Sequence, residues 1–233
     1  MVLFCMVSLY FLDLLCYKRH FMMNLRRKID REEFDYPALM SALSMYAKPR
    51  DKVTSLLQQG VIVRVKKGLY VYGDDYRKRP FSRELLANLI YGPSYVSLEY
   101  ALSWHGLIPE RVPVITSVTP KRGKRFVTPV GGFIYRCTPS ASFYLGMDRV
   151  VQKSFSFLIA TPERALADKL RDDRGGSIRT QKEIASYLFD NLRINQSLFC
   201  KMDVDFLGKL GDVLSSRKIA LCCCLLERMR SKP

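Results

Sequence analysis

Residues 49–72 read PRDKVTSLLQQGVIVRVKKGLYVY, and this stretch decides the expected fold. Apolar residues recur at helical spacing up to Gly60, a residue type that is common just after a helix. Two β-rich runs follow, Val61 to Val65 and Leu69 to Tyr72, and Lys66-Lys67-Gly68 joins them. A helix followed by a tight basic hairpin is typical of the second half of a winged helix-turn-helix, whose helix enters the major groove while its hairpin contacts the backbone.

The residues upstream predict the first half of the same module. Asp35 to Met45 carries its apolar residues on one helical face, and Tyr46 to Lys48 predicts a turn. The second helix is expected from Pro49 to Gly60, where Val53, Leu56 and Leu57 would face the core. The whole module is therefore expected over residues 24–79.

Basic and short polar side chains on the second helix and the hairpin are candidate DNA contacts. Donors of this kind suit base edges and phosphates, and lysines at a hairpin tip suit the backbone. The competing interpretation is an ordinary solvated helix face followed by a basic β-turn. The helix considered alone favours that interpretation, whereas the adjoining hairpin favours DNA binding. The candidates are Arg50, Lys52, Thr54, Ser55, Gln58, Arg64, Lys66 and Lys67.

Composition narrows the classes of protein to consider. The chain has 233 residues, of which 48% are hydrophobic, so it is long and apolar enough to fold around one large or two smaller cores. Lys and Arg number 38 against 22 Asp and Glu, which gives a formal net charge of +16. An excess of this size favours nucleic acid, an anionic membrane or an acidic protein as partner.

The cysteines do not form a recognisable metal or disulfide pattern. There are seven, three of them consecutive, and the chain contains no C-x-x-C pair and two histidines. A structural zinc site needs four closely placed ligands, so no metal site or cofactor is expected. We expect the cysteines to be small buried apolar residues in a reducing cytoplasm.

The first 17 residues, MVLFCMVSLYFLDLLCY, are strongly apolar. They lack a basic leading region and a small-residue cleavage site, so a secretory signal is not expected. As a membrane span they are short and contain Asp13, although basic residues follow them. The favoured interpretation is that residues 1–23 are an extension created by a start codon assigned too early, with the native start at Met22 or Met23.

Residues 80–233 predict a C-terminal domain of a different kind. Strand and helix patterns are mixed up to about residue 170, and residues 178–230 are mainly helical in pattern. The expected fold class is therefore α+β: an N-terminal winged helix-turn-helix followed by a mixed α/β domain that ends in a helical bundle.

A second concentration of positive charge falls in this C-terminal domain, where no acidic residue occurs between Arg111 and Met147. Such a patch would contact DNA beside the hairpin or face an acidic protein partner. Cations that protect a solvated hairpin edge from aggregation are the competing explanation. The patch consists of Lys121, Arg122, Lys124 and Arg125.

Acidic residues near position 170 raise the alternative of a metal-dependent nuclease, which needs converging carboxylates. Glu163 and Asp168 are five residues apart on a predicted helix and so lie on different faces. Asp172 and Asp173 fall in a predicted loop beside Lys169. Helix capping and surface ion pairs explain these residues better, and no enzymatic activity is expected. His105, without a partner in the sequence, is expected to be a core or helix-capping residue.

Five blocks occur in an order that resembles the AbiEi family: GVIVRVKKGLYV, YVSLEYALSWHGLIPE, ITSVTPKRGKRF, GGFIYRC and ATPERALADKL. The resemblance covers roughly Phe34 to Leu170. It implies the antitoxin of a type IV, abortive-infection toxin–antitoxin system. A winged helix would bind and repress the promoter of its own operon, and a C-terminal domain from Phe81 would counteract a nucleotidyltransferase-like toxin, directly or indirectly. A stand-alone transcriptional regulator and a winged helix that binds only protein are the alternatives.

Overall fold

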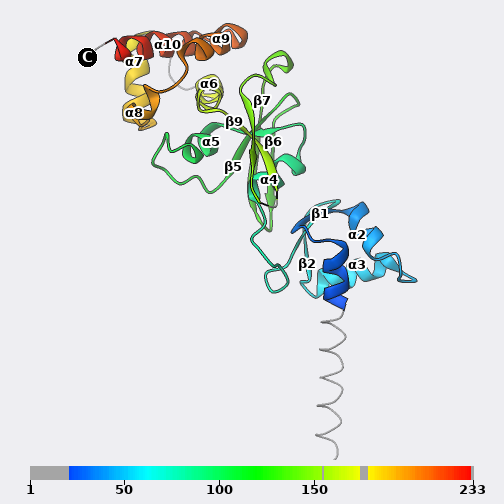
Figure 1. Cartoon of the computed structure of the whole chain (residues 1–233). Coiled ribbons are helices and arrows are strands. Elements are labelled where there is room, and N and C mark those ends of the chain that lie inside the picture. Colours follow the sequence, from blue (N-terminus) through cyan, green and yellow to red (C-terminus); the bar gives the residue numbers. More distant parts are fainter. Residues whose placement is uncertain (1–20, 154, 174–177, 232–233) are drawn as a thin grey trace, which may run out of the picture. The chain divides into compact units, whose positions relative to one another are not determined.

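The computed structural model describes residues 21–153, 155–173 and 178–231, so residues 1–20 of the expected N-terminal extension lie outside it. The chain divides into two compact units, Met1–Ser82 and Arg83–Pro233 (Figure 1). Each unit contains both helices and strands, which confirms the α+β class. No helix among the described residues has both the length and the apolar character needed to cross a bilayer.

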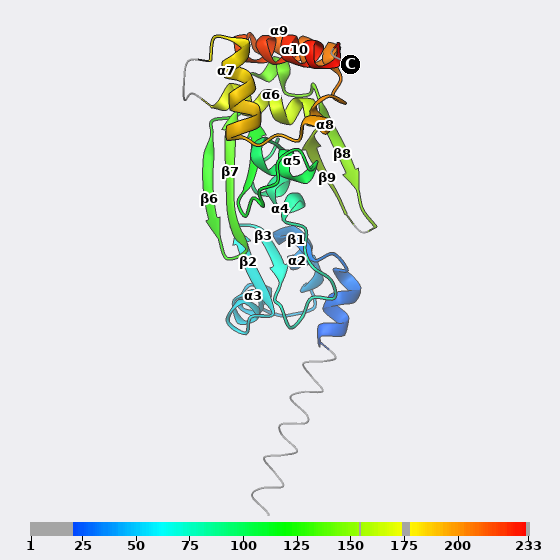
Figure 2. The same ribbon diagram turned by 90° about the vertical axis from the view of Figure 1, so that its left-hand side faces the viewer.

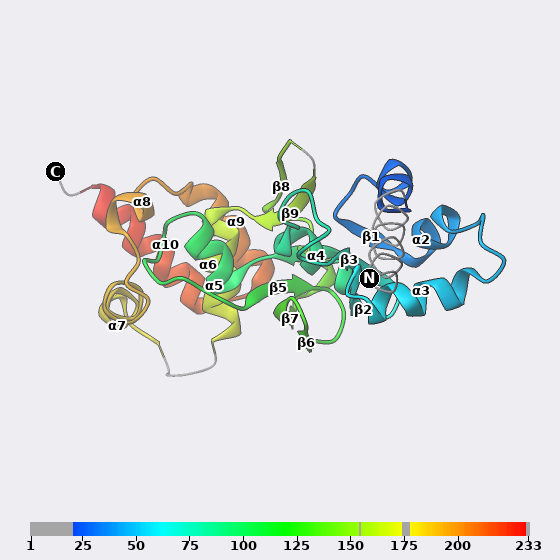
Figure 3. The same cartoon turned by 90° about the horizontal axis from the view of Figure 1, so that it is seen from below.

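In the described part of unit 1, residues 21–28 are helical and are followed by a short strand, two helices and two further strands. Its three strands form one antiparallel sheet in the order β1-β3-β2. Helix α3 packs beside strand β2 (Figure 3). The later elements are β1 (Glu33–Asp35), α2 (Tyr36–Ala42), α3 (Pro49–Gln58), β2 (Ile62–Lys66) and β3 (Leu69–Tyr72).

Capping residues fix the ends of these helices. The Asp35 side chain accepts a hydrogen bond from the Ala38 amide at 2.9 Å and so caps α2. Helix α2 stops at Ala42, earlier than the expected Met45, which is 70% exposed and has no core to cover. Helix α3 starts at Pro49 as expected and ends two residues before Gly60, whose φ of +67° suits glycine.

The hairpin contains an irregularity in its strand pairing. Arg64 pairs with Tyr70 and Lys66 with Leu69, so Val65 is an extra residue in a β-bulge. The bulge lets Ile62 and Val65, three positions apart, both be buried, whereas Val63 is half-buried. Burial along β2 therefore does not alternate strictly between its two faces.

The core of unit 1 combines aliphatic and aromatic side chains with one buried ion pair. Arg26 bonds Glu32 at 2.8 Å, and both side chains are at most 6% exposed. The guanidinium carbon of Arg26 also lies 3.5 Å from the centroid of the Tyr72 ring, so the cation has an aromatic as well as an anionic partner. These contacts fasten the first helix to the sheet.

Unit 2 is built on a six-stranded mixed sheet in the order β6-β7-β5-β4-β9-β8 (Figure 2). The pairs β5–β7 and β4–β9 are parallel and the others antiparallel. Strands β6 and β8 lie at its two edges. The strands are β4 (Tyr95–Val96), β5 (Ile115–Thr119), β6 (Lys124–Thr128), β7 (Gly131–Cys137), β8 (Met147–Val151) and β9 (Ser156–Ala160).

The helices of unit 2 pack on this sheet and on one another. Helix α4 packs on β4, β5 and β9, while α5 packs on β5 and on α6. Helix α10 packs on α6, α7 and α9 and completes the helical end that the sequence predicts. The helices are α4 (Arg83–Ile90), α5 (Leu98–Trp104), α6 (Pro162–Asp172), α7 (Gln181–Ser186), α8 (Gln196–Phe199), α9 (Val204–Leu214) and α10 (Arg217–Arg230). A π-helical turn, Tyr187–Asn191, extends α7, and a 3₁₀ turn covers Ser140–Ser142.

The expectation that the cysteines are all buried is wrong for part of the set. Cys222 and Cys223 are buried within α10, and burial raises the pKa of the Cys223 thiol to about 11. Cys224 in the same helix and Cys137 at the end of β7 are exposed, and Cys200 is half-buried. Helical periodicity explains the difference within α10, because neighbouring positions are about 100° apart around the axis.

Candidate nucleic-acid interface

Helix α3 presents a row of polar side chains to solvent. Val53 and Leu56 anchor its other face in the core of unit 1. Arg50, Thr54 and Gln58 recur every four residues and are all exposed. The Thr54 hydroxyl donates to the Arg50 carbonyl at 3.3 Å, a contact that leaves the oxygen lone pairs available to an outside donor. Three of the five expected contact residues on α3 thus lie on one accessible face of this helix.

Two other candidates on α3 make contacts inside unit 1. The Lys52 ammonium lies 4.4 Å from the Phe21 ring centroid and 5.4 Å from that of Tyr46, which holds it against aromatic faces. The Ser55 hydroxyl accepts a hydrogen bond from the Gln59 amide at 2.9 Å. Both residues are half-buried, so they lie beside the exposed row and not within it.

The hairpin carries three exposed cations, Arg64 on β2 and Lys66 and Lys67 at its tip. The turn closes at Gly68, whose φ of +87° is a left-handed conformation that favours glycine. The Gly68 carbonyl accepts from the Tyr36 amide at 2.9 Å, which ties the tip to the start of α2. The backbone of the tip is therefore held in place while its cationic side chains reach solvent.

Positive charge predominates in the segment that contains α3 and the hairpin. Between Pro49 and Gly73 there are five basic residues and one acidic residue, Asp51. Asp51 occupies the first turn of α3, where a carboxylate interacts favourably with the helix dipole. An exposed cation that the sequence analysis did not single out, Lys48, immediately precedes the helix. A surface of this kind attracts polyanions through phosphate contacts and counterion release.

The second basic patch is split between the two faces of a strand. Lys121 and Lys124 place their ammonium groups 5.7 and 5.1 Å from the centroid of the Tyr91 ring, and the Tyr91 hydroxyl donates to the Arg122 carbonyl at 3.1 Å. Arg125 follows Lys124 on β6 and so points to the opposite face of the sheet. The four residues share a turn and a strand but not a single surface.

The carboxylates considered for metal-dependent catalysis have separate partners. Glu163 accepts from the Asp203 amide at 3.1 Å, and Asp172 pairs with Arg136 at 3.1 Å. Asp173 lies 3.8 Å from Lys169, the lysine of the same sequence cluster. Among the described residues no group of three His, Cys, Asp or Glu side chains is placed to hold a metal ion. His105 bonds the Ala160 carbonyl through Nε2 at 2.8 Å and ends α5, the capping role that its sequence position predicts.

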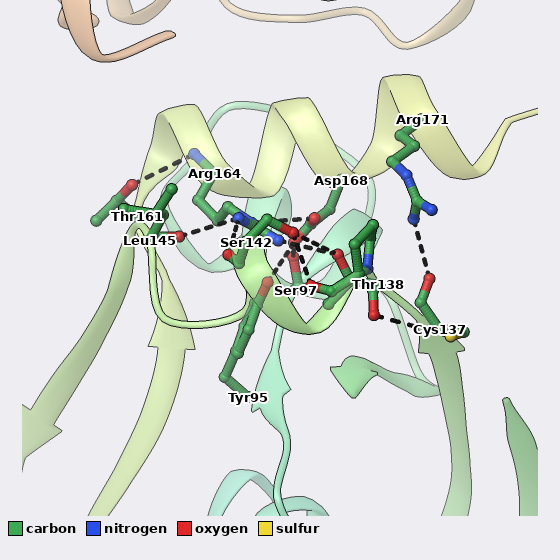
Figure 4. A network of polar contacts seen from close by, with 11 residues as sticks. Tyr95, Ser97, Cys137, Thr138, Ser142, Leu145, Thr161, Arg164, Asp168 and Arg171 are labelled. Atoms are coloured by element: carbon green, nitrogen blue, oxygen red, sulfur yellow. Dashed lines mark hydrogen bonds and ion pairs between the residues drawn. The ribbon is translucent and has the colours of Figure 1, made fainter. Parts of the chain in front are cut away.

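Asp168, the remaining acid of that cluster, belongs to a buried polar network in unit 2 (Figure 4). Its partner Arg164, one helical turn earlier on α6, donates from Nε to the carboxylate at 3.0 Å, and the two side chains are 0% and 2% exposed. Tyr95 and Ser97 donate their hydroxyls to the other carboxylate oxygen at 3.0 and 2.8 Å. Burial raises the pKa of Asp168, while Arg164 and the two hydroxyls oppose that rise.

The rest of the Arg164 guanidinium is also satisfied. Nη1 donates to the carbonyls of Ser142 and Leu145 at 2.6 and 3.1 Å, and Nη2 donates to the Thr138 hydroxyl at 3.2 Å. Helix α6 begins with Thr161, which caps it by accepting from the Arg164 amide. The network is closed to solvent and fully paired, so its chemistry is that of a structural clamp.

The network explains three of the sequence blocks in physical terms. YVSLEYAL supplies Tyr95 and Ser97, ATPERALADKL supplies Arg164 and Asp168, and Thr138 directly follows GGFIYRC. No family model matches the chain, and no curated protein matches it. The blocks therefore carry the AbiEi resemblance by themselves, and what they explain directly is how unit 2 is held together.

Sequence reasoning did not find the network because its members are distant along the chain. The hydrogen bond from the Tyr95 hydroxyl to the Asp168 carboxylate, for example, joins residues that are 73 positions apart in the sequence. One local signal was present, namely Arg164 and Asp168 at i, i+4 spacing on a predicted helix. That spacing alone does not distinguish a buried pair from a surface pair.

Proposed function

We propose that residues 24–79 form a winged helix-turn-helix that binds the promoter DNA of its own operon and represses transcription. In this proposal α3 is the recognition helix and the β2–β3 hairpin is the wing. The chain as a whole would act, without catalysis and in the cytoplasm, as the antitoxin of a type IV toxin–antitoxin system resembling AbiEi.

The observation that carries the DNA-binding part is the exposed row on α3 beside a hairpin with a cationic tip. Arg50 and Gln58 have the donors and acceptors needed to read base edges. Lys66 and Lys67 supply charge for the phosphate backbone. The order of helix, strand, helix, helix and hairpin agrees with this module, as does the net charge of +16.

The antitoxin part depends on the AbiEi resemblance. The blocks from Tyr95 to Leu170 belong to unit 2, and the buried Arg164–Asp168 network gives them a structural role. Unit 2 is thus a separately packed body that has a task of its own in this proposal. We assign no single residue to the neutralisation of a toxin.

Fluorescence anisotropy of the full chain tests the DNA-binding part. The labelled duplexes are the DNA upstream of the gene and a shuffled duplex of the same length and composition. We expect Arg50→Ala and Gln58→Ala to reduce the preference for the upstream duplex, because a good bidentate base contact gives about 1–3 kcal/mol of discrimination. Lys182→Ala on α7 is the matched control on an exposed cation outside unit 1. Equal affinity of the wild-type chain for both duplexes would exclude sequence-specific autoregulation.

Co-expression with the product of an adjacent nucleotidyltransferase-like gene tests the antitoxin part. Restored growth in the presence of this chain supports the proposal. Toxicity that the chain does not relieve, together with specific DNA binding, would favour a stand-alone regulator. Restored growth by a chain that binds no DNA would favour a winged helix that acts through protein contacts.

A further inference from the structure

Strand β6 (Lys124–Thr128) is an edge of the six-stranded sheet and bonds β7 on one side only among the described strands (Figure 2). Its two faces differ. Phe126 packs 5.7 Å from Tyr135 and 5.9 Å from Tyr91, ring centroid to centroid, which covers one face. On the other face Arg125 is exposed and Val127 is 83% exposed. The strand thus offers both a backbone edge and an accessible face.

The accessible face continues onto β7 and forms one side of a groove of about 710 Å³. Arg125 pairs in register with Ile134, and Arg136 follows two residues later on the same face. Arg171, at the end of α6, lines the groove and donates to the Cys137 carbonyl at 3.0 Å. Three guanidinium groups and the side chain of Ile134 therefore border one cleft.

One carboxylate lies in this groove. Asp172 bonds Arg136 at 3.1 Å, and the two side chains are 35% and 54% exposed. A pair that is exposed to this degree contributes little to stability, so its replacement by an outside carboxylate costs little. The groove thus already holds a carboxylate–guanidinium contact of the type that an acidic ligand would make.

From these features we infer that the β6 edge and the groove beside it bind an extended acidic segment of a partner protein. The segment adds a strand to β6, so that backbone hydrogen bonds supply affinity and alternate side chains supply specificity. On the accessible face its acidic side chains reach Arg125, Arg136 and Arg171, and its apolar side chains, which alternate with them, lie on the opposite face of the sheet. Lys124 and Arg125 on the edge also disfavour pairing between two copies of this chain.

The character of the groove favours a polypeptide over nucleic acid. Base stacking needs exposed aromatic faces, whereas the tyrosine that lines the groove, Tyr135, is 1% exposed. Ile134, which lines the groove, and Val127, which lies on the same face of β6, provide apolar contact area that phosphates do not use. The inference concerns unit 2 and does not depend on the DNA-binding proposal.

Fluorescence polarisation of the full chain with a labelled peptide of alternating Val and Glu, about eight residues long, tests the inference. An alternating Pro–Glu peptide of equal charge is the matched probe, because proline removes every second N–H and the chain cannot pair as a strand. We expect the Val–Glu peptide to bind at least tenfold more tightly than the Pro–Glu peptide. Equal binding of the two would overturn the strand-addition mechanism.

The double variant Arg125→Glu, Arg136→Glu should weaken Val–Glu binding at least tenfold, and Arg125→Glu alone at least threefold. Lys182→Glu with Lys201→Glu changes the net charge equally at exposed positions on other elements and should leave binding within twofold. Circular dichroism shows whether each variant keeps its fold. If the double variant unfolds, the peptide affinity of Arg125→Glu alone tests the inference. Unchanged peptide affinity, or a loss of duplex DNA affinity in place of peptide affinity, would overturn the inference.

Discussion

Neutralising Asp168 should destabilise unit 2 by several kilocalories per mole. Asp168→Asn keeps the size of the side chain and an oxygen that can accept from Tyr95 or Ser97, but it leaves the Arg164 cation without a counter-charge. Arg164 and Asp168 are 0% and 2% exposed, so water cannot replace the lost partner. Removing one member of such a buried pair costs about 3–5 kcal/mol.

Trp104 makes the measurement specific, because it is the single tryptophan of the chain and lies in unit 2. For a domain of this size, about 1 kcal/mol shifts the melting temperature by roughly 2–4 °C, so tryptophan fluorescence should show a decrease of roughly 6–20 °C. Arg164→Met with Asp168→Leu removes both charges but leaves the buried hydroxyls and carbonyls around them unpaired, so it should recover only part of the loss.

Asp172→Asn is the matched control, because its ion pair with Arg136 is partly exposed and should contribute less than about 1 kcal/mol. If Asp168→Asn proves as mild as Asp172→Asn, the buried network is not the clamp that holds α6 to the sheet.

Three further predictions concern other parts of the chain. Gly68→Ala should destabilise unit 1 by about 1–2 kcal/mol, because alanine is strained at the positive φ of this turn, and amide hydrogen exchange of unit 1 measures the loss. Alkylation followed by peptide mapping should modify Cys137 and Cys224 quickly in the native chain and Cys222 only after unfolding, because burial raises the pKa of the Cys222 thiol. Burial also raises the pKa of Glu33, so its favourable contribution is complete below the ordinary value of 4.5 and is lost as pH rises through the higher folded-state pKa. Glu33→Gln should flatten this decline in the exchange-derived stability of unit 1.

Each of these predictions has a clear contrary result. Wild-type protection in Gly68→Ala would mean that the hairpin tip relaxes without strain. Labelling of Cys222 at the rate of Cys224 would contradict the packing of α10. A pH profile of stability that is the same with Glu33 and with Gln would show that this carboxyl titrates alike in the folded and unfolded chain.

Local patterns in the sequence predicted two helices and the hairpin of unit 1, and the mixed and then helical character of unit 2, because caps, glycines and apolar periodicity are local signals. Strand β8 (Met147–Val151) escaped prediction because it is an edge strand with two charged residues and an exposed valine, and only pairing with β9 gives it strand structure. The bulge at Val65 escaped for a similar reason, since register is set by the partner strand. These features depend on neighbours that are distant in sequence or on exact pairing.

The candidate site was predictable to a similar extent. Helical spacing predicted that Val53, Leu56 and Leu57 face the core, and in the structure Val53 and Leu56 are buried while Leu57 is half-buried. The same spacing could not reveal that Lys52 packs over Phe21, which belongs to a helix that the sequence analysis did not predict. The charge pattern alone also did not show that the side chains of Lys124 and Arg125, which are adjacent in sequence, lie on opposite faces of a sheet.

The salt dependence of DNA binding tests the central claim most directly, namely that the hairpin lysines contact phosphates. The affinity of the full chain for its upstream duplex is measured over a series of salt concentrations, for the wild type and for Lys66→Ala with Lys67→Ala. Each lost phosphate contact should reduce the slope of log affinity against log salt by about 0.9, so the variant should be flatter by up to about 1.8. The pair Lys182→Ala with Lys201→Ala should keep the wild-type slope. A hairpin variant with the slope and affinity of the wild type would contradict the claim.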